Sequence, residues 1–114
     1  MFEGAPLLLL KTTGARSGAE RVNPVMYMPD GDRFVVFASK GGAPSHPDWF
    51  HNLVANPEVE VEVGTDSFPA RAIVVEGTER DELFARQASL YPQFRKYQDG
   101  TDRVIPVVIL ERTS

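Results

Sequence analysis

Arginines and glycines gather near the N-terminus in a pattern that could bind an anion. Residues 12–18 have the sequence TTGARSG, which includes Arg16, and Arg21 follows shortly after. Glycine lets the backbone turn its N–H groups toward an anion, and guanidinium groups bind phosphate or carboxylate through paired hydrogen bonds. The segment therefore predicts an anion site, with an exposed hairpin loop carrying solvated arginines as the alternative.

A second polar segment, residues 39–42 with the sequence SKGG, stands shortly before a helix that we expect to begin near Pro47. Backbone donors, the Lys40 ammonium and a helix N-terminus could converge there on a phosphate. The lysine precedes the glycines, so the segment is not a Walker A loop. An ordinary connection between a strand and a helix is the alternative.

Aromatic residues form the third group. Tyr91, Phe94 and Tyr97 are spaced at i, i+3 and i+6, so on a helix they share one face and could line a wall of a pocket. A tyrosine hydroxyl can donate a hydrogen bond to an oxygen that gains negative charge during a reaction. The alternative is that these rings only close the end of a hydrophobic core.

Composition excludes several kinds of chemistry. The 114 residues include no cysteine, so thiolate nucleophiles, iron–sulfur clusters and cysteine-bound zinc are ruled out. The two histidines, His46 and His51, lack the i, i+4 spacing of a helical metal site, and we expect no protein-held metal. Redox chemistry would then come from a bound organic cofactor.

Charge is distributed unevenly along the chain. The formal net charge is −4, yet residues 1–40 contain one more basic than acidic side chain. A small cationic region on an acidic body suits a compact anion and argues against a nucleic-acid partner. No signal sequence or membrane-spanning run is recognisable, so we expect a cytoplasmic protein.

Hydrophobic patterning predicts one domain over residues 1–114, mainly β with two to three helices (α+β). Six strands are expected, at 7–11, 21–28, 33–39, 58–63, 68–76 and 104–110. Pro24 implies an edge or a bulge in the second strand. Helices are expected at 47–56 and from Thr78, as N-cap, to Pro92, followed by a connector. Short turns and few helices favour a small antiparallel barrel.

The chain resembles the deazaflavin-dependent nitroreductase family over nearly its whole length. The resemblance is carried by seven segments: 7–18, 21–24 (RVNP), 38–42 (ASKGG), 47–53 (PDWFHNL), 55–57 (ANP), 91–92 (YP) and 101–107 (TDRVIPV). It implies an antiparallel split β-barrel related to flavin-binding reductases. It also implies use of the reduced 8-hydroxy-5-deazaflavin coenzyme F420.

The resemblance also implies roles for individual site residues. The residues implied to hold the anionic tail of the coenzyme are Ala15, Arg16, Ser17 and Arg21. Those implied to lie near its phosphate, its ring or the flanking helix are Pro24, Val25, Met26, Ser39, Lys40, Asp48, Trp49, Asn52 and Phe94. Family members commonly have Gly-Arg-Lys-Ser-Gly at residues 14–18, so Ala15 replaces a cation and weaker tail binding, or a preference for fewer glutamates, is expected.

Catalytic roles are implied for Tyr91, Tyr97 and Ser39. The tyrosines would position an electron acceptor and donate a hydrogen bond to its developing oxyanion. Phe94 stands where the nitroimidazole-reducing branch has a third tyrosine, and its missing hydroxyl leaves nitroimidazole reduction open while quinone reduction is expected.

The resemblance implies an oxidoreductase that transfers a hydride from reduced F420 to a small-molecule acceptor: a quinone, a nitroaromatic or an activated enone. An FMN-dependent split-barrel reductase and a non-catalytic F420-binding carrier are the alternatives. Peripheral access to membrane quinone is a further expectation, and the oligomeric state is left open. Many family members have a longer N-terminal segment, which we expect this sequence to lack.

Overall fold

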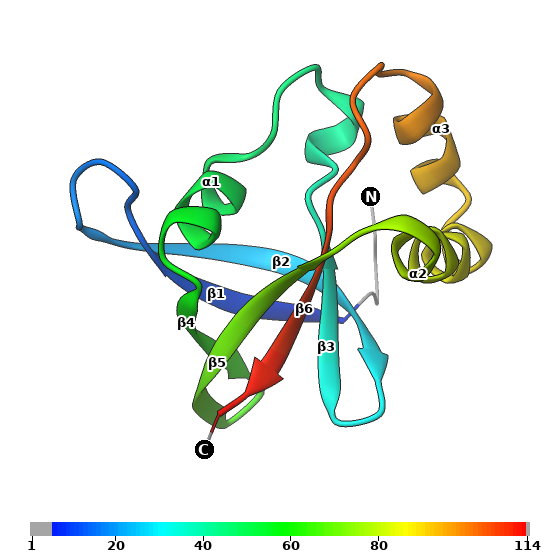
Figure 1. Ribbon diagram of the computed structural model, residues 1–114. Coiled ribbons are helices and arrows are strands. Elements are labelled where there is room, and N and C mark those ends of the chain that lie inside the picture. The colour runs from blue at the N-terminus through cyan, green and yellow to red at the C-terminus, as the bar shows by residue number, and fades with distance from the viewer. Residues whose placement is uncertain (1–5, 114) are drawn as a thin grey trace.

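Six antiparallel strands close into a barrel in the computed structural model, which describes residues 6–113 (Figure 1). They are β1 (Leu7–Thr13), β2 (Glu20–Asp30), β3 (Arg33–Phe37), β4 (Glu58–Val63), β5 (Asp66–Val75) and β6 (Val107–Arg112). Their order around the barrel is β1-β2-β3-β6-β5-β4, and every neighbouring pair is antiparallel. The expected antiparallel barrel is confirmed.

Strand burial follows the sequence pattern. In β4, Val59 and Val61 are buried while Glu58 and Glu60 are exposed, as strict alternation requires for a half-buried strand. The central strands β3 and β6 are apolar on both faces, because the barrel interior covers one face and helices cover the other. The final strand begins at Val107, three residues later than expected.

Three α-helices and one short turn connect the strands: α1 (Asp48–Ala55), α2 (Gly77–Leu90), α3 (Gln93–Asp99) and η1 (Lys40–Gly42). Two details of the helix boundaries were predicted wrongly. Pro47 is the N-cap of α1 and not its first helical residue, and α2 begins at Gly77 with Glu76 as N-cap, so Thr78 lies inside the helix. The expected connector after Pro92 contains α3. Within residues 6–113, none of these helices combines the length and apolar character needed to cross a bilayer.

Two hydrophobic cores lie on opposite faces of the sheet. The inner core fills the barrel and includes Leu10 and Val61, with Trp49 and Leu53 of α1 closing one end. The outer core lies beneath α2 and α3 and is built from apolar residues of the sheet and of both helices: Phe37, Phe84, Phe94 and Ile109 are among its members. Figure 1 shows α2 and α3 on the same side of the barrel, and α1 beside the hairpin that joins β1 to β2.

The first half of β2 is an open edge. It pairs with β1 through residue 26, but its pairing with β3 begins only at Tyr27. Pro24, paired with Leu9 of β1, lies within this unshared stretch, where its missing N–H costs no ladder bond. The expectation of an edge at Pro24 is confirmed.

The close approach of η1 to α3 predicts unequal effects of two glycine substitutions. A Cβ added to Gly42 (φ +82°) would lie 2.9 Å from the Tyr97 carbonyl oxygen, whereas one added to Gly41 (φ +64°) would meet nothing within 4 Å. Gly41→Ala should cost about 1 kcal/mol of unfolding free energy for its left-handed backbone. Gly42→Ala should cost clearly more, because backbone atoms must move as well. Urea unfolding measures both, and equal costs would contradict this contact.

Candidate functional site

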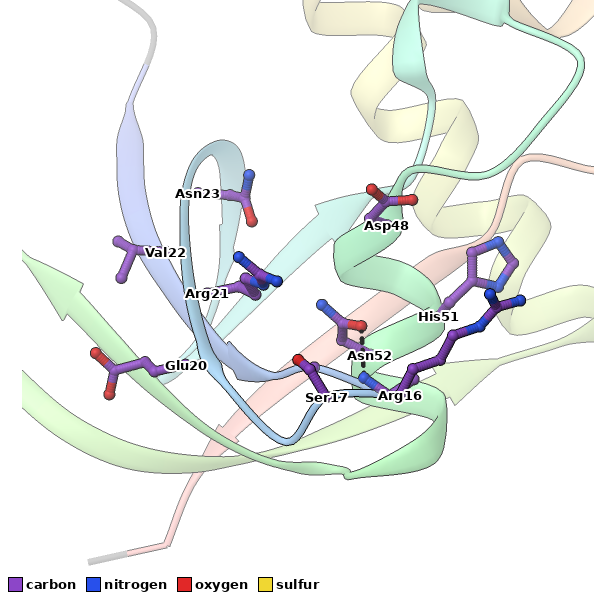
Figure 2. Close-up of a pocket in the computed structure, with 11 residues that line it drawn as sticks. Arg16, Ser17, Glu20, Arg21, Val22, Asn23, Asp48, His51 and Asn52 are labelled. Atoms are coloured by element: carbon purple, nitrogen blue, oxygen red, sulfur yellow. Dashed lines mark hydrogen bonds between the residues drawn. The ribbon is translucent and has the colours of Figure 1, made fainter.

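A cleft of about 1140 Å³ lies between the β1–β2 hairpin and α1 (Figure 2). Its walls are the hairpin loop, the first residues of β2 and the exposed side of α1; the lining residues are Gly14, Ala15, Arg16, Ser17, Glu20, Arg21, Val22, Asn23, Asp48, His51 and Asn52. Six of the predicted coenzyme-contacting residues therefore share one cleft: Ala15, Arg16, Ser17, Arg21, Asp48 and Asn52.

Strand alternation decides which β2 side chains face α1. Arg21 pairs with Thr12 of β1, and Thr12 is buried toward the barrel interior and α1. Arg21 and Asn23 therefore point across the cleft, while Glu20 and Val22 point the opposite way, as Figure 2 shows. The acidic side chain next to Arg21 in sequence is thus directed away from it.

The buried amide of Asn52 fixes the hairpin loop to α1. Its Oδ1 accepts a hydrogen bond from the Ala15 N–H at 3.0 Å, and its Nδ2 donates to Thr12 Oγ1 at 3.2 Å. Asn56, the C-cap of α1, donates more weakly to the Thr13 carbonyl at 3.5 Å. Asn52, predicted from the resemblance as a coenzyme contact, thus already uses its amide to hold the loop.

The loop glycines do not offer their N–H groups to a ligand. The Gly14 N–H donates to the Ala19 carbonyl and the Gly18 N–H to the Gly14 carbonyl. The prediction that the glycines let the backbone direct its N–H groups toward an anion therefore rests on the other residues of the loop. Among the hairpin residues 14–18, the N–H groups of Arg16 and Ser17 are the ones left without an intramolecular acceptor.

Two guanidinium groups stand free at the cleft. Within residues 6–113, neither Arg16 nor Arg21 forms an ion pair or a side-chain hydrogen bond, and both are exposed. Figure 2 shows Arg16 extending from the loop in the direction of His51, with Asp48 above Asn52 on α1. Two cations without partners make the cleft a suitable receptor for a multiply charged anion.

Ser39 and Lys40 lie outside this cleft, in the loop from β3 to α1. Lys40 has a left-handed backbone (φ +47°), and its ammonium lies 3.3 Å from Ser45 Oγ. The Arg103 guanidinium holds both ends of the loop, binding the carbonyls of Ala38, Ser39 and Ala43. Sequence reasoning gave Arg103 no individual role, although it lies in the family segment 101–107, because its partners are 57 to 65 positions away in the chain.

The aromatic group lies against the outer core and not in the cleft. Phe94 is buried, with its ring edge-on to Tyr97 at 5.2 Å and to Phe37 at 5.8 Å, so it closes the core as the alternative interpretation expected. Tyr91 and Tyr97 are half-buried beside it, and Tyr91 precedes α3. Tyr97 contacts η1 through its backbone, which brings it near Lys40.

Four other predicted residues are placed by packing. Val25 and Trp49 are buried in the inner core, where Trp49 anchors α1. Met26 packs on the outer core, and its sulfur accepts a hydrogen bond from Gln87 at 3.1 Å. Pro24 is exposed on the open edge of β2. Their contacts with a coenzyme stay predictions.

His46 joins the Arg103-bound loop to the cleft. Its Nδ1 lies 2.8 Å from Arg103 Nη1, and its ring centre lies 5.7 Å from that of His51, which lines the cleft. Burial lowers the pKa of His46, and the positive charges of Arg103 and His51 lower it further. His46 is therefore neutral near pH 7, and since Nδ1 accepts from Arg103, its proton is on Nε2.

The fold and the cleft define a small split-barrel protein with an unpaired cationic lining. The family model described as F420H(2)-dependent quinone reductase matches residues 1–112, and the chain belongs to this family. It is 42% identical to the F420H(2)-dependent quinone reductase Rv1261c of Mycobacterium tuberculosis, over 94% of this chain and 74% of that protein. The family resemblance inferred from the motifs is confirmed.

Solved structures agree with this assignment. A structure of an F420-H2 dependent reductase, FDR-A, is 42% identical and superposes with a TM-score of 0.84, covering 93% of this chain and 94% of that one. A structure described as a domain-swapped dimer has the same identity and TM-score, covering 93% and 80%. The split-barrel fold is thus shown.

Loss of the Asn52 amide should loosen the hairpin loop. Asn52→Leu removes both hydrogen bonds and leaves the buried Thr12 hydroxyl without its partner, so we expect a cost of about 2 kcal/mol of unfolding free energy. Hydrogen exchange at the Ala15 amide should accelerate. Asn56→Leu, which removes one long bond, is the matched control and should cost less than about 1 kcal/mol. Equal exchange rates in the two variants would contradict the role of Asn52.

The lowered pKa of His46 predicts a pH-dependent stability. The unfolded chain binds a proton at the usual His pKa of 6.5 and the folded chain at a lower pH, so the stabilisation is complete above 6.5 and is lost as pH falls below it. His46→Asn retains an acceptor for Arg103 but does not titrate. Urea unfolding between about pH 7.5 and 5 should show a steeper decline for the wild type than for His46→Asn. Parallel curves would refute the prediction.

Proposed function

We propose that this chain catalyses the transfer of a hydride from reduced coenzyme F420 to a quinone. Membership of the F420H(2)-dependent quinone reductase family supports the reaction. The observation that assigns the binding of the coenzyme to particular residues is the pair of free guanidinium groups, Arg16 and Arg21, at a cleft of about 1140 Å³. Such a cleft fits a coenzyme with an anionic tail, which brings the redox chemistry that a chain without cysteine lacks.

In this proposal the cleft holds the tail. Arg16 and Arg21 bind phosphate or carboxylate oxygens, and the N–H groups of Arg16 and Ser17 add neutral donors. Asn52 keeps the loop in place before the ligand arrives, which lowers the ordering cost of binding. Asp48 places one negative charge at the same cleft and Ala15 adds no positive one, so a tail with few carboxylates is favoured.

Ser39, Lys40, Tyr91 and Tyr97 form the proposed reacting end. The coenzyme supplies the hydride. Lys40 supplies a positive charge near it, and the tyrosine hydroxyls orient the acceptor and donate a hydrogen bond to the oxygen that becomes negative. Phe94 adds no hydroxyl, because a phenylalanine ring has none, and the ring is buried in the outer core. The protein thus contributes orientation and electrostatic stabilisation.

A quinone is the proposed acceptor, and nitroaromatics and activated enones are comparison substrates. Cytoplasmic location with peripheral access to membrane quinone also belongs to the proposal, as does self-association, for which the domain-swapped dimer structure is the supporting observation. The FMN-dependent reductase and the non-catalytic carrier are the alternatives that a binding and turnover experiment must separate.

The decisive experiment titrates the protein with F420 and with FMN, then follows reduced F420 oxidation with each acceptor class. The proposal expects F420 binding, weak or absent FMN binding, and turnover with a quinone. Tight FMN binding without F420 binding would support the flavin reductase. F420 binding without turnover on any acceptor would support the carrier.

Removal of the two free guanidinium groups should weaken coenzyme binding. For Arg16→Ala with Arg21→Ala, we expect the Kd for F420 to rise about tenfold to a hundredfold and to depend less on ionic strength. Arg71→Ala, which removes an exposed arginine that pairs with Glu58 and does not line the cleft, is the control and should leave the Kd unchanged. An unaltered Kd in the double variant would remove both residues from the site.

A further inference from the structure

We infer that Arg103 is a positioning residue for the coenzyme site: it fixes the loop that carries Ser39 and Lys40 against the helix that carries Tyr97. The inference rests on the proposed function, since those residues form its reacting end. It adds a residue that neither the motifs nor the family description assigns to the site.

The Arg103 guanidinium binds both ends of the loop at once. Its Nε donates to the Ala43 carbonyl at 2.7 Å, and its Nη1 donates to the Ala38 carbonyl at 3.0 Å and to His46 Nδ1 at 2.8 Å. Its Nη2 donates to the Ser39 carbonyl. The acceptors therefore stand on either side of Lys40, and a planar group with several fixed donors is needed to reach them together.

The loop between these anchors does not keep its shape unaided. Lys40, Gly41 and Gly42 have φ values of +47°, +64° and +82°, so three consecutive residues are left-handed. For lysine, which has a Cβ, this conformation costs about 1 kcal/mol or more. Tertiary contacts must hold the segment, and the carbonyls that Arg103 binds directly flank it.

Arg103 is in turn held by the helices of the outer core. The Gln98 amide on α3 donates to the Arg103 carbonyl at 2.8 Å and accepts from the Ile105 N–H at 2.9 Å. Arg80 on α2 donates to the same Gln98 oxygen at 2.8 Å and to the Ile105 carbonyl at 2.9 Å. One hydrogen-bonded chain thus runs from α2 and α3 through Arg103 to the loop of Ser39.

The charge of Arg103 is not neutralised by its neighbours. Among residues 6–113, no carboxylate lies within ion-pair distance of it, and its acceptors are three carbonyls and a neutral imidazole. Burial lowers the pKa of the guanidinium, yet arginine stays protonated near neutral pH. The loop therefore lies in a positive potential, which favours a negatively charged ligand beside Ser39 and Lys40.

Two variants separate positioning from charge. Arg103→Gln removes both the planar guanidinium with its several donors and the positive charge. Arg103→Lys keeps the charge but cannot reach acceptors on both sides of Lys40. Arg33→Gln, which removes the ion pair with Asp30 at the other end of β3, is the control for loss of stability. Each protein is compared in urea unfolding, in F420 titration, in hydrogen exchange over residues 38–46, and in steady-state kinetics with reduced F420 and a quinone.

We expect both Arg103 variants to raise the Kd and the KM for the coenzyme about tenfold or more, with kcat per folded molecule changed less than about threefold. Exchange should accelerate over residues 38–46 and stay slow in the barrel strands. A merely structural role would lower the folded fraction, and hence the apparent kcat, without raising the KM.

Three outcomes would overturn the inference: a Kd within about twofold of wild type in Arg103→Gln, full recovery of binding in Arg103→Lys, or an equal loss in Arg33→Gln. Failure of the wild type to bind F420 would instead refute the proposed function. In that case the exchange measurement still tests whether Arg103 holds the loop, because it needs no coenzyme.

Discussion

The bond between the Asn52 amide and the Ala15 N–H is the constraint on which the cleft depends. The loop end of the β1–β2 hairpin extends beyond the pairing of β1 with β4 and of β2 with β3, so one buried side chain on α1 supplies a partner for it. Trp49 and Leu53, on the same helix, anchor that helix in the inner core. Hydrophobic packing fixes the position of α1, and the Asn52 hydrogen bond to Ala15 fixes the loop relative to α1. The positions of the cationic residues depend on both.

The barrel and most of its strands could be predicted from the sequence, because alternation and apolar runs report directly on which faces are buried. The glutamates of β4 and the two-sided burial of β3 are examples. Residues 93–99 were assigned to a connector although Tyr91, Phe94 and Tyr97 have helical spacing, because a helix of seven residues is too short for a sustained apolar period. Burial of Phe94 in the outer core stabilises α3. The start of α2 was misplaced because threonine is a favoured N-cap residue, whereas here the N-cap is Glu76 and no side chain caps the helix.

The site was predictable only in part, for a physical reason. Exposed arginines beside glycines stand out in a sequence, so Arg16 and Arg21 could be found. Residues that hold other residues do not stand out: Asn52 and Arg103 act over separations of 37 to 65 positions, which only the folded chain brings together. Ser39 and Lys40 belong to a loop held by Arg103, outside the arginine cleft. The walls of the proposed site therefore depend on separate anchors.

Pro24 has a consequence for association between molecules. An open strand edge usually invites another chain to extend the sheet, and such addition needs an uninterrupted row of donors and acceptors. The pyrrolidine ring interrupts that row midway along the unshared half of β2. Intermolecular sheet extension is thereby discouraged beside Asn23, which lines the cleft.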